Sequence, residues 1–352
     1  ARVANMVFLS PVGRTQSNAA LRPWGRLAWA ADRYYLMAWY SGRNSIEPQY
    51  ALASGAPVED KSRIVHLEAQ TNQPLFGGRG RVVLGSSVRN TAVNSERTLI
   101  APQDDNRNDW SYSAYGQMEY SLGSHWRFVG AGRYDDGDLY QAQLSPKAAI
   151  VYSPNPNHSI RATINRAFLT PSTLEFFVRF PATAPADFGP LEAALRASPL
   201  GPALSGVPNG ALFTTSSSVP VLVLGNPNLK VEHVTSLELG YKGQVGRRVY
   251  LALDAYYSRF SDFVTDILPG VNPTYAPWTA PAAVPGNVAP ILEQAVRDAL
   301  AAGGQPVAAA GLTRLPDGST AVVLSVGNAG RVEEYGLEPS IGIRLGSGIS
   351  VE

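Results

Sequence analysis

Apolar and polar residues alternate with a period of two along most of this chain, which is the pattern of β-strands with two different faces. The clearest example is residues 110–134, WSYSAYGQMEYSLGSHWRFVGAGRY. One set of alternate positions in its first half is largely apolar, with aromatic residues near both ends, and the other set is mostly polar. The apolar set is Trp110, Tyr112, Ala114, Gly116, Met118, Tyr120 and Leu122. The segment therefore predicts two long strands around a tight turn at 123–125.

The same alternation predicts about twelve strands, at residues 3–9, 24–31, 33–42, 61–72, 79–90, 110–122, 125–135, 139–153, 158–168, 229–242, 247–267 and 326–345. Short turns and longer links alternate between them. The turns fall at 32–33, 77–80, 123–125, 154–157, 244–247 and 346–348. The longer links are 11–23, 43–60, 92–109, 169–227 and 268–324, and one link, 136–138, is short. This order predicts an antiparallel sheet with tight turns at one rim and large loops at the other.

Two of the long links also contain short helical patterns, at 190–198 and 290–304. In the second, Leu292, Ala295, Val296 and Ala299 form an apolar stripe, and Glu293 lies four residues before Arg297. We expect short helices within the large loops. The alternation is least regular in residues 24–42, around the turn at 32–33.

The aromatic residues at the ends of the apolar faces indicate the surroundings of these faces. Trp110 and Tyr120 lie on one face about 33 Å apart along an extended strand, which becomes about 25 Å along the axis when the strand tilts by about 40°. That is the height of the apolar band of an outer-membrane barrel, with aromatic rings at both interfaces. We place Tyr140 with Tyr152 at the same spacing, and Trp126 with Tyr134 at a slightly shorter one.

A soluble β-sandwich or propeller is the alternative, but its strands are usually about 5–6 residues long. Long strands and aromatic ends favour an all-β, antiparallel transmembrane β-barrel with its apolar face toward outer-membrane lipid. The polar face then lines a wet lumen. Its charged candidates are Glu119, Arg127, Arg133, Lys147 and Arg161, which either contact something in the lumen or are solvated wall residues.

Composition excludes several other functions. Charged residues make up 16% of the chain and the formal net charge is +1, so no nucleic-acid partner is expected. The chain has no cysteine, and its four histidines, His66, His125, His158 and His233, lack ligand spacing. Catalytic elbows, phosphate loops and dinucleotide fingerprints are missing, and GGRGR (77–81) and YDDGD (134–138) are interpreted as turns. We predict no metal, no cofactor and no enzymatic activity.

Three motifs resemble the barrel of TonB-dependent outer-membrane receptors. Residues 224–243, LGNPNLKVEHVTSLELGYKG, are similar to the family's GNP-[ND]-L-x-P-E segment and the E-x-G strand that follows, although Val231 replaces a proline. Residues 164–172, INRAFLTPS, resemble an F-R-x-P-S box in which Leu169 replaces arginine. Residues 328–340, NAGRVEEYGLEPS, resemble the start of a later strand. The matching residues of the first two motifs are Phe168, Pro171, Ser172, Gly225, Asn226, Pro227, Asn228, Leu229, Glu232, Glu238 and Gly240.

The resemblance covers roughly residues 61–350 and implies a barrel of twenty-two strands closed by an N-terminal plug. Residues 1–352 would then be one partial barrel domain, without the plug and the C-terminal strands. The implied function is energy-coupled import of a scarce, bulky solute, such as a siderophore, cobalamin or a glycan, across the outer membrane of a Gram-negative bacterium. The plug would be the partner that links the barrel to the TonB complex.

The resemblance also directs attention to the large loops 169–227 and 268–324 as part of the outer binding surface. Their aromatic residues are candidate solute contacts, although aromatic loop residues more often serve packing: Phe176, Phe177, Phe180, Tyr275 and Trp278. Haem receptors of this family use a histidine between the two motif boxes. Residues 169–227 contain no histidine, so haem is not the expected solute.

Two other functions stay open at this point. One is a passive porin or adhesin-type barrel without a plug, and the other is an extracellular carbohydrate-active β-protein. An upstream plug would separate energy-coupled import from the first alternative. Dependence on detergent for solubility would separate both barrel functions from the second.

Overall fold

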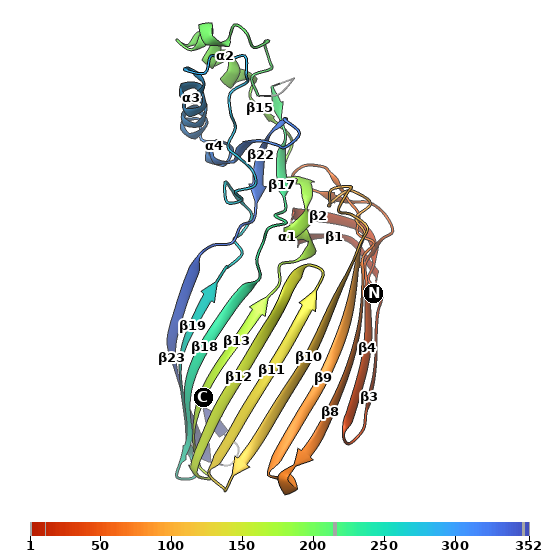
Figure 1. Cartoon of the computed structure of the whole chain (residues 1–352), viewed down its shortest axis with the longest axis vertical. Coiled ribbons are helices and arrows are strands. Elements are labelled where there is room, and N and C mark those ends of the chain that lie inside the picture. Colours follow the sequence, from red (N-terminus) through yellow and green to blue (C-terminus); the bar gives the residue numbers. More distant parts are fainter. Residues whose placement is uncertain (1, 11, 214–216, 347–348, 352) are drawn as a thin grey trace.

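A single curved antiparallel sheet dominates the computed structural model, which describes residues 2–10, 12–213, 217–346 and 349–351 (Figure 1). In these ranges the sheet has twelve strands, and each is antiparallel to its neighbours. Their order in the sheet is their order in the chain: β3 (Trp24–Ala30), β4 (Tyr34–Gly42), β8 (Arg63–Leu75), β9 (Gly80–Val93), β10 (Arg107–Leu122), β11 (Trp126–Gly137), β12 (Tyr140–Asn155), β13 (His158–Leu169), β18 (Glu232–Val245), β19 (Val249–Ser261), β23 (Arg331–Gly346) and β24 (Ile349–Val351). The predicted all-β antiparallel barrel fold is confirmed.

Short and long connections alternate as predicted. At one rim the strands are joined by tight turns, at 31–33, 76–79 (which includes the short helix η1, Phe76–Gly78), 123–125, 156–157 and 246–248. At the other rim the connections are 43–62, 94–106, 138–139, 170–231 and 262–330. The predicted turn at 346–348 falls largely outside the described residues. We call the rim with the large connections the loop rim, and the other the turn rim.

The first predicted strand is wrong as a member of this sheet. Residues 3–9 lie in β1 (Arg2–Ser10), which pairs with β2 (Gly13–Leu21), a segment predicted to be a link. With β5 (Asn44–Ser45), β6 (Gln49–Ala51) and β7 (Pro57–Val58) they form, within the described residues, a separate five-stranded sheet at the loop rim (Figure 1). Asn5 has a φ of 50° and interrupts the ladder, and β2 buries small or polar residues such as Thr15 and Ser17. Neither strand offers lipid a continuous apolar face.

The two largest connections, 170–231 and 262–330, fold together above the loop rim into what we call the head (Figure 1). Strand β17 (Val221–Leu224) of the first pairs in parallel with β22 (Thr320–Ser325) of the second. Helices α2 (Gly189–Ala197) and α3 (Ala289–Ala302) confirm the two predicted helical segments. The other head elements are α1 (Thr173–Phe177), β14 (Arg179–Pro181), β15 (Ala186–Asp187), η2 (Gly201–Leu204), β16 (Ser218–Val219), β20 (Leu268–Pro269), α4 (Pro306–Gly311) and β21 (Leu312–Arg314).

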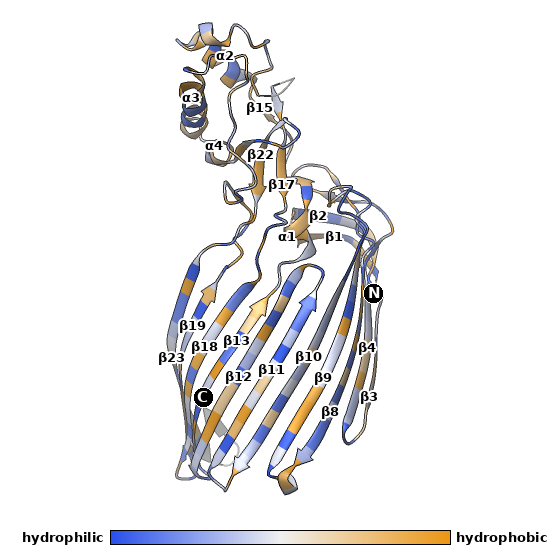
Figure 2. Ribbon diagram, in the orientation of Figure 1, coloured by the Kyte–Doolittle hydropathy of each residue, from blue (hydrophilic) through white to orange (hydrophobic). Residues whose placement is uncertain are grey.

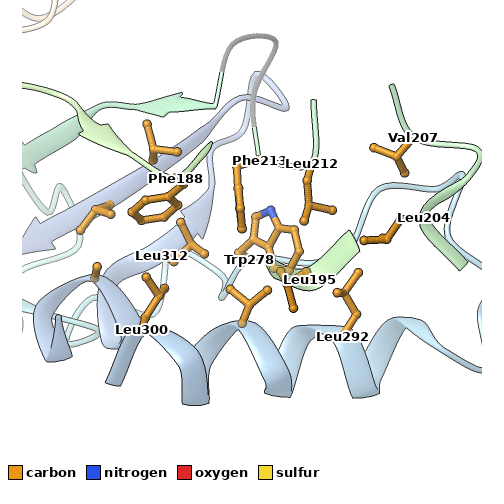
Figure 3. Packing of buried hydrophobic residues seen from close by; sticks show 14 of the residues in the cluster. Phe188, Leu195, Leu204, Val207, Leu212, Phe213, Trp278, Leu292, Leu300 and Leu312 are labelled. Atoms are coloured by element: carbon orange, nitrogen blue, oxygen red, sulfur yellow. The ribbon is translucent and has the colours of Figure 1, made fainter. Parts of the chain in front are cut away.

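The head has its own hydrophobic core, drawn from both connections (Figure 3). Phe188 and Leu212 of the first connection pack with Trp278, Leu292 and Val296 of the second, and each is at least nine-tenths buried. Such burial is what holds two long loops in one arrangement, because it removes large apolar side chains from water. Within the ranges that the structure describes, none of the helices has the length and apolar character required to cross a membrane.

Candidate functional site on the concave face

Strand register divides the barrel side chains between two faces of opposite character. Most of the exposed large apolar residues lie on one face, whereas the buried polar residues of the described barrel strands lie on the other: His66, Asp109, Ser113, Asp135 and Thr163. Tyr112, for example, is 54% exposed and the next residue, Ser113, only 8%. Side chains converge on the concave side of a curved sheet, so the polar face is the concave one. Figure 2 shows the alternation of orange and blue along the strands.

The five predicted lumen residues share this concave face. Glu119 lies opposite Val129, and Arg127 and Arg161 both lie opposite Val151. Arg133 lies opposite Tyr115, and Lys147 opposite Ala131. The register therefore places Glu119, Arg127, Arg133, Lys147 and Arg161 on one wall, as the alternation in sequence requires.

Aromatic rings mark both ends of the convex face. At the turn rim, Trp126 lies against Tyr152 with ring centroids 4.4 Å apart. At the loop rim, Trp110 stacks on Tyr112 at 6.3 Å. The prediction for Tyr140 is wrong, because a register irregularity between Asp135 and Gly137 turns this side chain to the concave face.

A connected group of side chains lies on the concave face of β4, β8, β9, β10 and β11, and we call it the inner cluster: Trp39, His66, Glu68, Arg89, Tyr115 and Arg133. The Tyr115 hydroxyl donates to Glu68 Oε1 at 2.7 Å, and His66 Nε2 is 3.7 Å from Glu68 Oε2. The His66 ring stacks on Trp39 at 5.4 Å. The guanidinium carbon of Arg89 is 5.8 Å from the centre of the Trp39 ring.

The Tyr115 ring fits over the neighbouring strand because the residue beneath it, Gly85, has no side chain. A Cβ at Gly85 would lie 2.7 Å from Cε2 of Tyr115 and closer still to Cζ. The ring thus covers a glycine of β9, an arrangement that protects the bare backbone of a strand. Arg133 lies 5.7 Å from the ring centre and donates to Asp135 at 2.9 Å. The ring position fixes the direction of the hydroxyl toward Glu68.

A pocket of about 380 Å³ opens between the inner cluster and the loop rim. Its lining includes His66, Arg89, Arg133, Asp135 and Tyr140. Asp135 is already paired with Arg133, and Glu68, beside the pocket, is bound by Tyr115. Arg89 has no hydrogen bond or ion pair within the described residues, and the buried Nδ1 of His66 has no hydrogen-bond partner. An uncompensated cation beside a free imidazole nitrogen suits an anionic group such as a carboxylate.

A second polar group lies farther along the same wall and is more acidic. Arg161 Nη2 lies 3.3 Å from Glu238 Oε2 and 3.2 Å from Asp254 Oδ1. Gly240 permits this bridge, since a Cβ there would collide with the Asp254 carboxylate. The hydroxyl of Tyr256 donates to Glu334 at 3.3 Å. Arg161 is thus an ion-paired wall residue, whereas Arg89 is an available cation.

The predicted solute-contact aromatics are mostly core residues. Phe180 is fully buried, and Phe176 and Trp278 are each 4% exposed. Phe177 packs against the Arg107 guanidinium, with the guanidinium carbon 3.9 Å from the ring centre, and the Tyr275 hydroxyl donates to the Gly225 carbonyl at 3.4 Å. These rings hold the head together, so in this structure Phe176, Phe180 and Trp278 are not available to a solute.

The motif residues near the first box mostly shape the junction between barrel and head. The Ser172 side chain caps α1, directly after Pro171, and the Phe168 ring contacts that of Tyr140 at 5.7 Å. Asn226 Nδ2 donates to the Val326 carbonyl at 3.1 Å, and its Oδ1 accepts from the Asn228 amide.

Close packing and a hydrogen bond account for three of the remaining motif residues, Gly225, Leu229 and Glu232. A Cβ at Gly225 would lie 2.6 Å from the Phe177 amide nitrogen, and the buried Leu229 packs near Phe176 and Val326. Glu232 accepts from the Val264 amide at 2.6 Å. Pro227 lies between Asn226 and Asn228 in the same tight segment. The motifs therefore fix where the first connection of the head leaves and rejoins the sheet.

Sequence reasoning missed Trp39, His66, Arg89 and Tyr115 as a group. Each lies on the polar set of its strand, which is a signal for the wall but not for the cluster. Their proximity depends on the register of five strands, and register is not visible in one strand. Across the described ranges, no set of three or more His, Cys, Asp or Glu side chains is grouped closely enough to hold a metal ion.

Comparison with protein families gives one match over nearly the whole chain. The family described as TonB dependent receptor-like, beta-barrel, matches residues 13–349. A comparison with curated protein sequences gives no match.

Solved structures of the same fold are similar over nearly all of this chain. The siderophore receptor PirA from Pseudomonas aeruginosa is 14% identical with a TM-score of 0.57, covering 96% of this chain and 48% of its own. A mutant form of the ferric enterobactin receptor PfeA from the same organism is 16% identical with a TM-score of 0.59, covering 95% and 43%. The Serratia marcescens hemophore receptor HasR is 12% identical with a TM-score of 0.55, covering 94% and 47%. The chain spans less than half of the length of each of these structures.

Proposed function

The chain belongs to the TonB-dependent receptor-like β-barrel family, and on this premise we propose that it forms part of the wall and outer surface of an energy-coupled importer. The importer takes up a scarce, bulky solute, such as a siderophore, cobalamin or a glycan, across the outer membrane of a Gram-negative bacterium. The observation that carries the proposal is the two-faced curved sheet: exposed apolar residues cover its convex side, and a polar wall with an open pocket lies on its concave side.

The physical argument for a membrane location is the free-energy cost of exposing the apolar side chains of the convex face to water. Leu144, Leu237 and Leu239 are more than half exposed there, as are many other large apolar residues of the barrel strands. A soluble protein rarely leaves such a continuous apolar band uncovered. Lipid can cover this band, and the hydrogen-bond ladders between neighbouring strands satisfy most strand amides away from the two edge strands, β3 and β24.

The concave wall contacts a plug domain in this proposal. Among the described residues Arg89 has no ion-pair partner, and it lies near the buried Nδ1 of His66, which has no hydrogen-bond partner, so the two groups suit a carboxylate supplied from outside the wall. A carboxylate of the plug would neutralise Arg89 and accept from the His66 imidazole when this nitrogen carries its proton. The plug would in turn connect the barrel to the TonB complex of the inner membrane, which supplies the energy.

The test uses the full-length protein that contains this chain, produced in a Gram-negative host without related receptors. Uptake of radiolabelled ferric siderophores, cobalamin and oligosaccharides is measured with the tonB gene intact and deleted. We expect accumulation of one solute class that disappears when tonB is deleted. Uptake that is equal in both hosts would favour the passive porin, and would contradict energy-coupled import.

A further inference from the structure

The base of the head is joined to the connection 94–106, which links β9 to β10, whereas the head begins after β13. Ile100 and Val178 face each other in an antiparallel bridge, and the Arg179 amide donates to the Leu99 carbonyl at 2.8 Å. Arg179 begins β14, which pairs with β17, so residues 99–100 extend the small sheet of the head. The head is therefore bonded to a loop that belongs to another part of the rim.

One hydrophobic cluster, which we call the base core, connects this loop, the head and the N-terminal sheet. Val12 of the β1–β2 hairpin and Val58 of the connection 43–62 pack there with Ile100, and the head contributes Phe180 and Val223. Each of these side chains is at most 9% exposed. Movement of the head away from the rim would expose them to water, which is unfavourable, and would leave their packed neighbours without contacts.

The barrel wall holds the base of the head as well. Arg107, the first residue of β10, donates to both carboxylate oxygens of Asp109, at 2.9 and 3.2 Å. Its guanidinium carbon is 3.9 Å from the ring centre of Phe177 in α1. The ion pair fixes the position of the guanidinium, and the cation–π contact then fixes the ring beside the end of β10. Helix α1 is thus attached to a strand that does not lead into the head.

The two connections of the head are bonded to each other where they leave the sheet, in a region that we call the neck. Asn328 Nδ2 donates to the carbonyls of Lys230 and Asp262, at 3.0 and 2.7 Å, and its Oδ1 accepts from the Lys230 amide at 2.8 Å. The bond from Asn226 to the Val326 carbonyl also crosses between the two connections. A hinge needs residues whose backbone angles can change. In the neck, side chains of each connection hold the backbone of the other, which opposes such a change.

A parallel strand pair connects the base core to the distal core of the head. Strands β17 and β22 pair from Val221 and Val322 to Val223 and Leu324 (Figure 1). Val322 is buried in the distal core, part of which is drawn in Figure 3, whereas Val223 is buried in the base core. Separation of the two cores would break this ladder. The head is therefore continuous from its tip to the rim.

We propose that the head, the connection 94–106 and the N-terminal sheet form one rigid column on the barrel wall. The column presents a preformed outer surface and does not fold over the lumen as a lid. A lid needs two packed arrangements of similar free energy. Closure of this column would have to break the base core, the contact between Arg107 and Phe177, and the bonds of the neck together. The inference rests on the proposed function for the location of the column outside the membrane.

The first experiment locks the head to the loop by a disulfide in the full-length protein, with any cysteine outside this chain replaced by serine. The variant is Ile100→Cys with Val178→Cys, and the two single variants are its controls. Paired residues of antiparallel strands have Cα atoms about 4.5–5.5 Å apart, which suits a disulfide. Uptake of radiolabelled ferric siderophores, cobalamin and oligosaccharides is measured after oxidation and after reduction with dithiothreitol.

We expect the disulfide to form and tonB-dependent uptake to change by less than about twofold, because the lock favours the arrangement that is already populated. A loss of more than about tenfold on oxidation that is reversed by reduction would show that the loop and the head separate during transport. That result would overturn the inference. Failure of the two cysteines to form a disulfide would contradict the contact between the loop and the head.

The second experiment does not depend on import. Spin labels are placed at the exposed positions of Ala53→Cys with Ala299→Cys, on the connection 43–62 and on α3, and pulsed electron paramagnetic resonance measures the distance between them. The reference is Ser124→Cys with Arg247→Cys, which labels two exposed turns of the turn rim. We expect one distance with a distribution as narrow as that of the reference.

A second distance, or a distribution much broader than the reference, would overturn the rigid column. A narrow distribution together with uptake that is equal with and without tonB would contradict the proposed function and support the column. The two experiments therefore separate a failure of the inference from a failure of energy-coupled import.

Discussion

The ring of Tyr115 occupies the space that a side chain at Gly85 would need, and this contact orients the inner cluster. From there its hydroxyl donates to Glu68, which in turn lies beside His66. Gly85, which has no side chain and lies on a different strand, thus determines the direction of the Tyr115 hydroxyl in the candidate site. The role of this contact can be tested by replacing Gly85.

Replacing Gly85 by valine should displace the Tyr115 ring and break its bond to Glu68. We expect a loss of about 1–3 kcal/mol in the free energy of unfolding, as for other insertions into packed space. Gly130→Val is the matched control, because no atom of the described residues lies within 4 Å of a Cβ at Gly130. Heat denaturation in detergent micelles measures both. Equal midpoints for the two variants would contradict the assigned role of Gly85.

Replacing Arg89 by glutamine should impair import without unfolding the barrel. The variant removes the pocket cation that has no ion-pair partner among the described residues. Loss of a charge-assisted hydrogen bond of about 1.5–3 kcal/mol corresponds to roughly a 10- to 100-fold change in a binding constant. The measurement is the initial rate of uptake of the solute identified in the tonB experiment. Arg63→Gln is the control, because Arg63 lies on the convex face of the neighbouring strand. A normal uptake rate in Arg89→Gln would show that the pocket cation has no part in transport.

Replacing Glu192 by glutamine should destabilise the head. The buried Glu192 carboxylate accepts from Arg196 at 2.6 Å and from the Gly210 amide at 2.9 Å, and the Ser217 hydroxyl donates to it at 3.2 Å. Removing one partner of a buried ion pair costs about 3–5 kcal/mol, because the other charge is left uncompensated. Limited proteolysis should cut the head faster in this variant, whereas the exposed Asp298→Asn should behave as the wild type.

The same carboxylate predicts how the head responds to acid. Burial raises the pKa of Glu192, but hydrogen bonds from Arg196 and from the Gly210 and Leu212 amides outweigh it and hold the pKa below its usual value. A carboxyl group whose pKa is lower in the folded than in the unfolded state stabilises the fold at a pH above its unfolded-state pKa. This stabilisation is lost as the pH falls through the pKa of the folded state. Proteolysis of the head should therefore accelerate in acid more steeply in the wild type than in Glu192→Gln. Parallel pH profiles would contradict this.

The barrel was predictable from sequence because the alternation that indicates each strand lies within the residues of that strand. Alternation in residues 110–134 depends on the period of the strand alone, and so does the shared wall of Glu119 and Arg161. Where a local irregularity intervenes, the prediction fails: the bulge near Gly137 turns Tyr140 inward, and Asn5 interrupts β1. Such irregularities change one residue's backbone and leave little trace in composition.

The head was predictable only in its helices. The apolar stripe of 290–304 is a local signal, and α3 follows it closely. The burial of Trp278 and Phe180 is not local, because it arises where two connections far apart in sequence share a core. Aromatic loop residues looked available for a solute because nothing in their own segment shows what covers them.

The most direct test of the central claim is cysteine scanning along β10, in the full-length protein in its native outer membrane. Single cysteines at 113, 114, 117 and 118 are possible without background from this chain, which has none of its own. We expect a small water-soluble maleimide to label positions 113 and 117, and a lipid-soluble reagent to label positions 114 and 118. Equal labelling of both sets, or the reversed pattern, would contradict a membrane wall with its polar face toward the lumen.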